Sequence, residues 1–366
     1  MPAVFIAHSY KYMSVFHIQG NLSGYSIGMS KRKKVLLIFG GESSEHEISI
    51  RSARNVYAAI DKDKYDVELC FIEASGQSWQ LVNSLDDLSG KIMSPELGKP
   101  EFVIDGVTHR YDVFLPILHG ENGHEDGAVQ GLAKLMHVPV VGCGIGASAV
   151  CWNKLYAKQI LEQNGISTAP YVVHRRGEDK KSYEDITGKL GAVLFVKPSS
   201  EGSSVGVSKV KDAEQFDAAI TNALRYSPEV LIESSIEGQE LEVAVLGDTL
   251  SGRISGVGEI VPGEEFYSYE DKYADDSKAQ VLTRANISDN IAEQARESAR
   301  AAYVCLGCEG LARVDFMLSK DGKLFLNELN TMPGFTSISQ YPKLWEEQGI
   351  SQPLLIDELI TMALGN

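Results

Sequence analysis

The sequence lacks any apolar segment of membrane-spanning length. No run of about 18 or more apolar residues occurs in its 366 residues, so we expect no part of the chain to cross a membrane. The apolar content of 43% is instead distributed along the chain, and it is sufficient for two or three globular domains with sizeable cores.

Basic residues are outnumbered by acidic ones. The chain has 34 Lys and Arg against 50 Asp and Glu, which gives a formal net charge of −16. A nucleic-acid-binding protein presents a concentrated basic surface, and this balance argues against one. We therefore expect no nucleic-acid partner.

Cysteine is also sparse, with five residues in the whole chain. Cys305 and Cys308 form a lone C-x-x-C pair, without a second pair or nearby histidines to complete a zinc site. Buried, reduced thiols are the simpler interpretation, and they indicate a cytosolic protein.

The first thirty residues have no sustained hydrophobic period and no basic start before an apolar run. A secretory signal is therefore not expected. Met29 precedes "SKRKKVLLIF", a basic segment that leads into a convincing strand. We predict that residues 1–30 are an N-terminal extension that is dispensable for activity.

The pattern of apolar segments predicts an α/β protein with three domains. In residues 31–142 the strand patterns "VLLIF", "YDVELCFI", "YDVFLPIL" and "PVVG" alternate with helical patterns, which predicts a parallel, doubly wound sheet. Residues 143–234 predict a small α+β domain, and residues 235–366 a further α+β domain with a helix near 288–306. Ligands commonly bind in the clefts between such domains.

The segment "RVDFMLSKDGKLFLNELN" (313–330) predicts a β-hairpin with clustered acids. A two-residue turn at Asp321-Gly322 would pair Leu318 with Phe325, Phe316 with Asn327 and Asp315 with Glu328. Arg313, Asp315, Glu328 and Asn330 would then share one face. Facing carboxylates repel each other. Either this face is a solvated edge, or its oxygen atoms bind Mg²⁺, Mn²⁺ or Ca²⁺. Because Mg²⁺ usually completes its coordination with substrate phosphates, a metal here implies a nucleotide.

Two glycine-containing segments are candidates for binding the phosphates of a nucleotide. In "VKPSSEGSSVGVSKV" (196–210), Lys197 ends a strand, and a Ser/Gly loop leads to a second strand near Val205. Such a loop lets backbone N–H groups approach phosphate oxygens, although it also fits a flexible hairpin and is not a Walker A motif. In "VVGCGIGASAV" the spacing is not that of a dinucleotide fingerprint, and a tight turn is the better interpretation.

Two further segments place polar residues beside strand ends. Glu45 in "IFGGESSEHEIS" is a candidate for binding an ammonium group, and a helix N-cap is the structural alternative. In "LHGENGHEDG", His119 directly follows a strand, where α/β sheets place functional residues.

Taken together, these segments resemble one known family. "FGGESSEHEIS", "LHGENGHEDG", "VKPSSEGSSVGVSKV", "EDKY", "GLARVDFML" and "NELNTMPGFTSIS" occur in this order, as in the D-alanine–D-alanine ligases of the ATP-grasp superfamily. The resemblance covers residues 34–366. It implies a three-domain ATP-grasp fold in which ATP lies between two antiparallel sheets, one in the central and one in the C-terminal domain.

The resemblance assigns a set of residues to ATP and metal. Lys154 and Lys197 would contact the phosphates, Glu233 would lie at the adenine hinge, and Glu240 would bind the ribose hydroxyls. Asp315, Glu328 and Asn330 would bind two Mg²⁺ or Mn²⁺ ions. Further nucleotide contacts are implied for Ser203, Ser204 and Lys272. A monovalent cation such as K⁺ activates some relatives, which the motifs leave open.

The implied reaction is the ATP-dependent joining of two D-alanines through a D-alanyl phosphate, for peptidoglycan precursor synthesis. The first D-alanine ammonium would bind Glu45, with His119 nearby and Ser203 and Tyr273 as partners of Glu45. The residues implied for the oxyanion and the second D-alanine are Arg313, the backbone N–H of Gly334, Ser339 and Gln340.

Tyr273 lies in a predicted lid around residues 262–280, and it favours D-alanine over D-lactate as the acceptor. The resemblance also implies a homodimer. The alternatives are another ATP-grasp carboxylate–amine ligase, a D-alanine–D-lactate or D-serine ligase, and a non-catalytic nucleotide-binding module.

Overall fold

The computed structural model describes residues 32–263 and 279–365. The predictions for residues 1–30, Lys272 and Tyr273 therefore lie outside the described residues. No helix in the described part is both long and apolar enough to cross a membrane.

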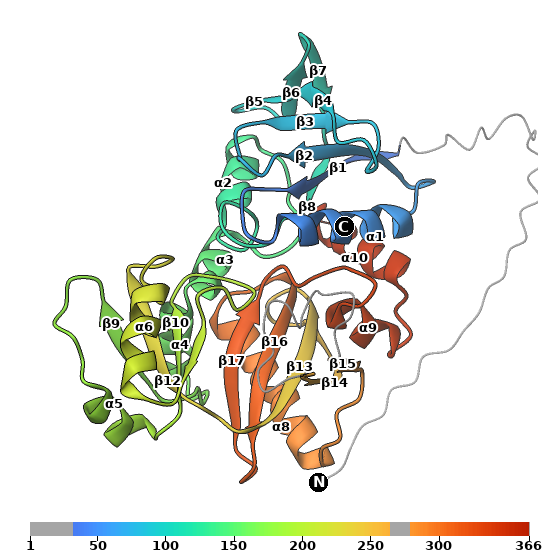
Figure 1. Ribbon diagram of the computed structural model, residues 1–366. Coiled ribbons are helices and arrows are strands. Elements are labelled where there is room, and N and C mark those ends of the chain that lie inside the picture. The colour runs from blue at the N-terminus through green and yellow to red at the C-terminus, as the bar shows by residue number, and fades with distance from the viewer. Residues whose placement is uncertain (1–31, 264–278, 366) are drawn as a thin grey trace, which may run out of the picture. The chain divides into compact units, whose positions relative to one another are not determined.

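The N-terminal sheet has five strands in the order β4-β3-β2-β1-β8 (Figure 1). Strands β2 and β8 pair in parallel with β1, as predicted, while β3 and β4 add an antiparallel edge that the sequence analysis did not include. The bounds are Lys33–Gly40 for β1, Tyr65–Ile72 for β2, Trp79–Val82 for β3, Gly90–Ile92 for β4 and Val113–Ile117 for β8.

Both faces of the N-terminal sheet are covered, which explains the continuous apolar run of β1. Helix α1 (His46–Ala59) packs on one face together with the C-terminal helix α10 (Gln352–Ala363). Helix α2 (Ala128–Leu135) packs on the other face. A small antiparallel sheet of β5 (Ser94–Glu96), β6 (Glu101–Ile104) and β7 (Val107–Arg110) adjoins that side.

The strand predicted at "PVVG" is wrong. Val140 forms only an isolated bridge to Phe114, and the chain turns away at Gly142, whose φ is 104°. Helix α3 (Ile145–Trp152) follows directly, and α4 (Lys154–Gln163) begins after it. The Asn153 side chain caps α4 by accepting hydrogen bonds from the N–H groups of Leu155 and Tyr156.

The central sheet is antiparallel, with the order β11-β10-β12-β9. Helices α5 (Tyr183–Leu190) and α6 (Ala213–Ala223) supply residues to its hydrophobic core. Strand β11 begins at Ser208 rather than near Val205, because Ser203, Ser204 and Gly206 adopt positive φ angles and keep the preceding loop turning. The bounds are Tyr171–Arg175 for β9, Leu194–Pro198 for β10, Ser208–Val210 for β11 and Glu229–Ser234 for β12.

The C-terminal sheet is also antiparallel, with the order β15-β14-β13-β16-β17. Helix α8 (Asp289–Cys305) packs against it through a shared apolar cluster, and α9 (Gln340–Glu346) lies near β13 and β14 (Figure 1). The bounds are Gly238–Gly247 for β13, Arg253–Val261 for β14, Gln280–Leu282 for β15, Gly310–Ser319 for β16 and Leu324–Asn330 for β17.

The β16–β17 hairpin differs from the predicted register near its turn. The Ser319 N–H donates to the Lys323 carbonyl at 2.9 Å, and Gly322 has a φ of 83°, so the loop has one residue more than predicted. Phe316 therefore pairs with Leu326 rather than Asn327, and Leu318 with Leu324 rather than Phe325. A bulge at Asn327 then restores the register, so Asp315 faces Glu328 as predicted. Because the register shifts by one residue in this part of the hairpin, Leu326 is buried and Phe325 is only half-buried.

The five cysteines are free thiols, as the composition indicated. Cys70, Cys143, Cys151 and Cys308 are buried, and Cys305 is half-buried. Burial raises the pKa of the Cys70 thiol well above its ordinary range, which makes this group unreactive.

Candidate active site

The predicted site residues that the structure describes all line one cavity of about 560 Å³. They come from loops after β1 and β8, from the central sheet and from the C-terminal sheet. The fold thus brings side chains from distant parts of the sequence to one cavity. The residues are Glu45, His119, Lys154, Lys197, Ser203, Ser204, Glu233, Glu240, Arg313, Asp315, Glu328, Asn330, Gly334, Ser339 and Gln340.

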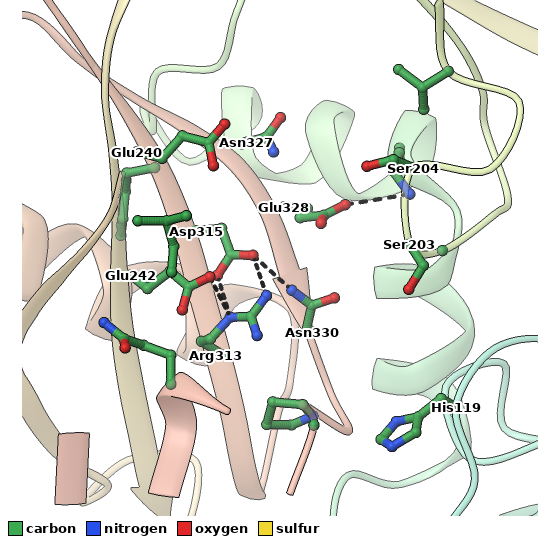
Figure 2. Close-up of a pocket in the computed structure, with 18 of the residues that line it drawn as sticks. His119, Ser203, Ser204, Glu240, Glu242, Arg313, Asp315, Asn327, Glu328 and Asn330 are labelled. Atoms are coloured by element: carbon green, nitrogen blue, oxygen red, sulfur yellow. Dashed lines mark hydrogen bonds and ion pairs between the residues drawn. The ribbon is translucent and has the colours of Figure 1, made fainter. Parts of the chain in front are cut away.

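Arg313 organises the acidic face of the β16–β17 hairpin (Figure 2). Its Nε and Nη2 atoms donate to the two carboxylate oxygens of Asp315, each at 2.7 Å, and Nε lies 3.2 Å from Glu242. The Asn330 amide also donates to Asp315, at 2.9 Å. Burial disfavours the charge of Arg313, but Asp315 and Glu242 outweigh it and hold the pKa of Arg313 well above its ordinary value. The guanidinium is thus a fixed cation on this face.

The oxygen atoms of this face suit a divalent cation. Asp315 lies opposite Glu328 in the hairpin, and Asn330 lies opposite Arg313. Asp315 Oδ1 accepts a hydrogen bond from Arg313, whereas Oδ2 accepts from both Arg313 and Asn330, so Oδ1 is the better placed of the two oxygens to bind a metal. Within residues 32–263 and 279–365, no three His, Cys, Asp or Glu side chains form a metal cage of their own. The donor set therefore fits an ion such as Mg²⁺ that takes further ligands from a phosphate.

Two lysines line the cavity beside this acidic face. The Lys197 ammonium, at the end of β10, lies 2.7 Å from the Glu233 carboxylate on β12. Lys154, the first residue of α4, lies 3.4 Å from Glu328. Burial alone would raise the pKa of Glu233, but the charges of Lys158 and Lys197 outweigh it and hold that pKa below its ordinary value. Glu233 is therefore an ionised carboxylate at the edge of the cavity.

The loop after β10 connects the central sheet to Glu45. Ser203 adopts a φ of 46°, and its hydroxyl donates to the Glu45 carboxylate. A Cβ atom on Gly202 would lie 2.7 Å from the same carboxylate, so a side chain at this position would displace it. The loop thereby fixes Glu45 at the wall of the cavity.

His119 is buried close to Glu45, and burial lowers its pKa. Its Nδ1–H donates to the Met332 carbonyl at 3.1 Å, which leaves Nε2 to accept from the Ser52 hydroxyl at 3.3 Å. The imidazole is therefore neutral and oriented, and it ties the loop after β8 to the segment that follows β17.

Ser339 and Gly334 form the end of the cavity beside α9. The Ser339 hydroxyl accepts a hydrogen bond from the Thr336 N–H at 3.0 Å, and a Cβ atom on Gly334 would lie 2.8 Å from it. Gln340 is buried, and its amide donates to the Leu282 carbonyl at 2.8 Å. This amide anchors the start of α9 to β15.

The cavity is also lined by ionisable residues that were not predicted from the sequence, Arg51, Glu125, Glu201, Glu242 and Lys343. Glu242 could have been found, because it lies two residues after Glu240 on the same strand and alternate residues share a face. Glu125 lines the cavity and accepts a hydrogen bond from the Gly120 N–H at 2.8 Å, and burial next to Glu45 raises its pKa well above the usual value. Lys158 lies behind Glu233, and no motif singled it out.

Two antiparallel sheets that present lysines and carboxylates to one cavity define the ATP-grasp fold class, as predicted. Models of a D-Ala D-Ala ligase N-terminus and a D-Ala D-Ala ligase C-terminus match residues 34–143 and 160–361. A D-alanine–D-alanine ligase from Sodalis glossinidius is 41% identical over 91% of this chain and 96% of its own length. The chain belongs to the D-alanine–D-alanine ligase family.

Solved structures agree with this assignment. The D-alanine–D-alanine ligase from Coxiella burnetii superposes with a TM-score of 0.83 at 33% identity, over 91% of this chain and 94% of its own. The VanG D-Ala:D-Ser ligase from Enterococcus faecalis superposes with a TM-score of 0.82 at 33% identity, over 91% of this chain and 100% of its own. The family resemblance and the fold inferred from the motifs are thus confirmed.

Proposed function

We propose that this chain is an ATP-dependent ligase that joins two D-alanines to D-alanyl-D-alanine for peptidoglycan precursor synthesis. One observation supports this above the others: Lys197 of the central sheet and Lys154 of α4 line the same cavity as the carboxylates of the C-terminal hairpin, and Glu45 lines it too. Cations and oxygen ligands that line one cavity together suit a triphosphate bound with a metal. A carboxylate beyond them suits the ammonium group of an amino acid.

The first step is phosphoryl transfer from ATP to the carboxylate of the first D-alanine. Such a transfer depends on positioning and on cations that stabilise charge on the moving phosphoryl group. Lys154 and Lys197 hold the phosphates, Glu233 and Glu240 hold the base and the ribose, and Glu45 holds the substrate ammonium. Asp315, Glu328 and Asn330 would hold Mg²⁺, which when bound supplies charge stabilisation to the phosphates.

The second step is attack by the amine of the second D-alanine on the acyl phosphate. A tetrahedral oxyanion forms and then collapses with loss of phosphate. Arg313 and the backbone N–H of Gly334 stabilise the oxyanion, a role that their place in the cavity lining allows. Ser339 and Gln340 orient the acceptor carboxylate, and the partners of Glu45 exclude water from the acyl phosphate.

The finer features of the proposal come from the family resemblance. They are two Mg²⁺ or Mn²⁺ ions, a lid that contains Lys272 and Tyr273, three domains bounded near residues 142 and 234, a homodimer, and a cytoplasmic location. The retained Tyr273 supports D-alanine rather than D-lactate as the acceptor.

A phosphate-release assay tests the proposal. Purified protein with ATP and Mg²⁺ should release phosphate when D-alanine is added and not when L-alanine is added, and chromatography should detect D-alanyl-D-alanine. Release with other amino acids only would indicate a different carboxylate–amine ligase. No release with any amino acid, while ATP still binds, would indicate a non-catalytic nucleotide-binding module. Preferential depsipeptide formation with D-lactate near neutral pH would contradict the acceptor assignment.

A further inference from the structure

Lys158 is a fully buried lysine that the proposed mechanism does not use. Its side chain is 1% exposed, and its ammonium lies 3.0 Å from the Glu233 carboxylate. The ammonium also lies 5.5 Å from the Tyr171 ring centroid and 3.5 Å from the Ala169 carbonyl oxygen. Burial lowers the pKa of Lys158, and the charge of Glu233 opposes that shift. A buried lysine is expensive unless it is paired, so its position requires a reason.

Glu233 has a lysine on each of its two oxygens. Oε1 lies 3.0 Å from Lys158, and Oε2 lies 2.7 Å from Lys197. Glu233 and Lys197 line the cavity, whereas Lys158 is not among the lining residues. The carboxylate therefore has one cationic partner inside the protein and one that a ligand can reach.

The two lysines differ in their freedom to move. Lys158 projects from α4 into the protein interior against the paired residues Tyr171 of β9 and Glu233 of β12, and it does not line the cavity. Lys197 lies at the cavity surface, and its ammonium also makes a long hydrogen bond, 3.4 Å, to the Asn327 side chain. A phosphate in the cavity would compete with Glu233 for Lys197, because a phosphate is a strong acceptor for lysine.

We propose that Lys158 is a positioning residue, the permanent counterion of Glu233, which allows Lys197 to leave Glu233 for a nucleotide phosphate. The oxygen that Lys197 leaves then accepts a hydrogen bond from the exocyclic amino group of adenine. This inference rests on the proposed nucleotide-dependent function and adds a role for a residue outside the cavity. Without Lys158, departure of Lys197 would leave a buried, unpaired carboxylate, which is strongly unfavourable. Lys197 would therefore stay on Glu233, and phosphate binding would weaken.

The test measures binding of the Mg²⁺ complex of inorganic tripolyphosphate, which has no base and reports phosphate contacts alone. Calorimetry should show about tenfold weaker binding to Lys158→Met than to the unmodified protein. Glu233→Gln, which releases Lys197, should bind as well as the unmodified protein or better. The double variant Lys158→Met/Glu233→Gln should recover the affinity of Glu233→Gln. If Lys158 only supported the fold, adding Glu233→Gln to Lys158→Met would not be expected to restore binding.

Further variants complete the test. Lys158→Arg keeps the charge and should bind within about twofold of the unmodified protein, and Lys180→Met removes an exposed lysine that pairs with Asp217 at 2.9 Å and should change nothing. If Lys158→Met does not fold, the double variant is compared with Glu233→Gln alone. The double variant is expected to fold because it has no carboxylate at residue 233 that would be buried without a partner. Binding to the double variant that is tenfold or more weaker than to Glu233→Gln overturns the inference.

The measurement is independent of ligase activity. Tripolyphosphate binding can be measured whether or not D-alanine stimulates phosphate release, so failure of this inference and failure of the proposed function are distinguishable. With ATP, Lys158→Met should raise the KM for ATP about tenfold while kcat and the KM for D-alanine change less than threefold. An equal loss in kcat and in affinity for both substrates would contradict a role confined to the nucleotide.

Discussion

The central sheet and the C-terminal sheet have the same antiparallel pattern but opposite charge at the cavity. The central sheet presents Lys197 and balances it with Glu233, which Lys158 also neutralises. The C-terminal sheet presents Arg313 among the carboxylates of Glu242, Asp315 and Glu328, so acid is in excess. The difference supports the proposal that the central sheet binds phosphate directly, whereas the C-terminal sheet needs a cation between its carboxylates and the phosphate.

Removing a carboxylate from the acidic face should have the largest effect. Glu328→Gln keeps the size of the side chain but removes a charged oxygen ligand, and metal-dependent charge stabilisation is worth several kcal/mol. We expect kcat for D-alanine-dependent phosphate release to fall about 10³-fold, equivalent to about 4 kcal/mol. Asp321→Asn, in the exposed turn of the same hairpin, is the control and should keep full activity. Unchanged dipeptide synthesis in Glu328→Gln would remove the basis for the metal assignment.

Arg313 is the cation on the acidic face, and its geometry should matter as much as its charge. Arg313→Lys retains one positive charge but cannot donate to both Asp315 oxygens, which accept from Arg313 at 2.7 Å each. Loss of one oxyanion donor costs about 10²–10³ in kcat, and we expect the lower end because charge remains. The measurement is kcat at saturating ATP and D-alanine. Arg296→Lys, at a half-buried position of α8 where the arginine pairs with Glu293, lies outside the cavity lining and should behave as the unmodified protein. A kcat within threefold would assign Arg313 a purely structural role.

The loop after β10, which follows a strand of the central sheet, also contacts Glu45 of the N-terminal region. A Cβ atom on Gly202 would lie 2.7 Å from the Glu45 carboxylate, so Gly202→Ala must displace one of them. We expect the Glu45 carboxylate or the loop to move by well below 1 Å. Because Glu45 is proposed to bind the ammonium group of D-alanine, this movement should raise the KM for D-alanine about tenfold and change the KM for ATP little. Gly188→Ala, where an added Cβ meets nothing within 4 Å, is the matched control. An equal rise in both KM values would show that the loop acts on the nucleotide instead.

The sequence predicts strands and motifs better than it predicts register. The Asp315–Glu328 pair was inferred from a two-residue turn that does not exist, and the bulge at Asn327 compensates for the extra loop residue. Turn residues indicate that a hairpin is present, but loop length and bulges depend on how both strands pack. At "PVVG" the residues have strand propensity, yet Gly142 redirects the chain.

Residues of the candidate site can be predicted from the sequence where one short motif contains them. Asp315, Glu328 and Asn330 follow from one hairpin, and Lys197 from one loop. Lys158 and Glu125 could not be selected, because their significance depends on burial and on partners from distant segments. Lys158 meets Glu233 across 75 residues of chain (from 158 to 233), and only the folded structure brings them together.

The smallest expected effect concerns a histidine in the N-terminal region, away from both charged sheets. Burial lowers the pKa of His124 to about 3, and its Nε2–H donates to the Val141 carbonyl at 3.1 Å. An unfolded histidine titrates near pH 6.5, so between pH 6.5 and 3 the unfolded state binds more protons. Stability must therefore fall as pH decreases through this range, and by pH 5 this histidine should cost roughly 2 kcal/mol of unfolding free energy.

His124→Gln should reduce that loss, because an amide can still donate to Val141 and does not titrate. The measurement is the urea midpoint at pH 7 and pH 5, where the variant should show a smaller difference than the unmodified protein. His119 also has a pKa lowered by burial, but it is present in both proteins and cancels from the comparison. His137→Asn, at an exposed position with a φ of 56° that asparagine tolerates, should keep the full pH dependence. Equal pH dependence in His124→Gln and the unmodified protein would show that His124 is protonated without unfolding.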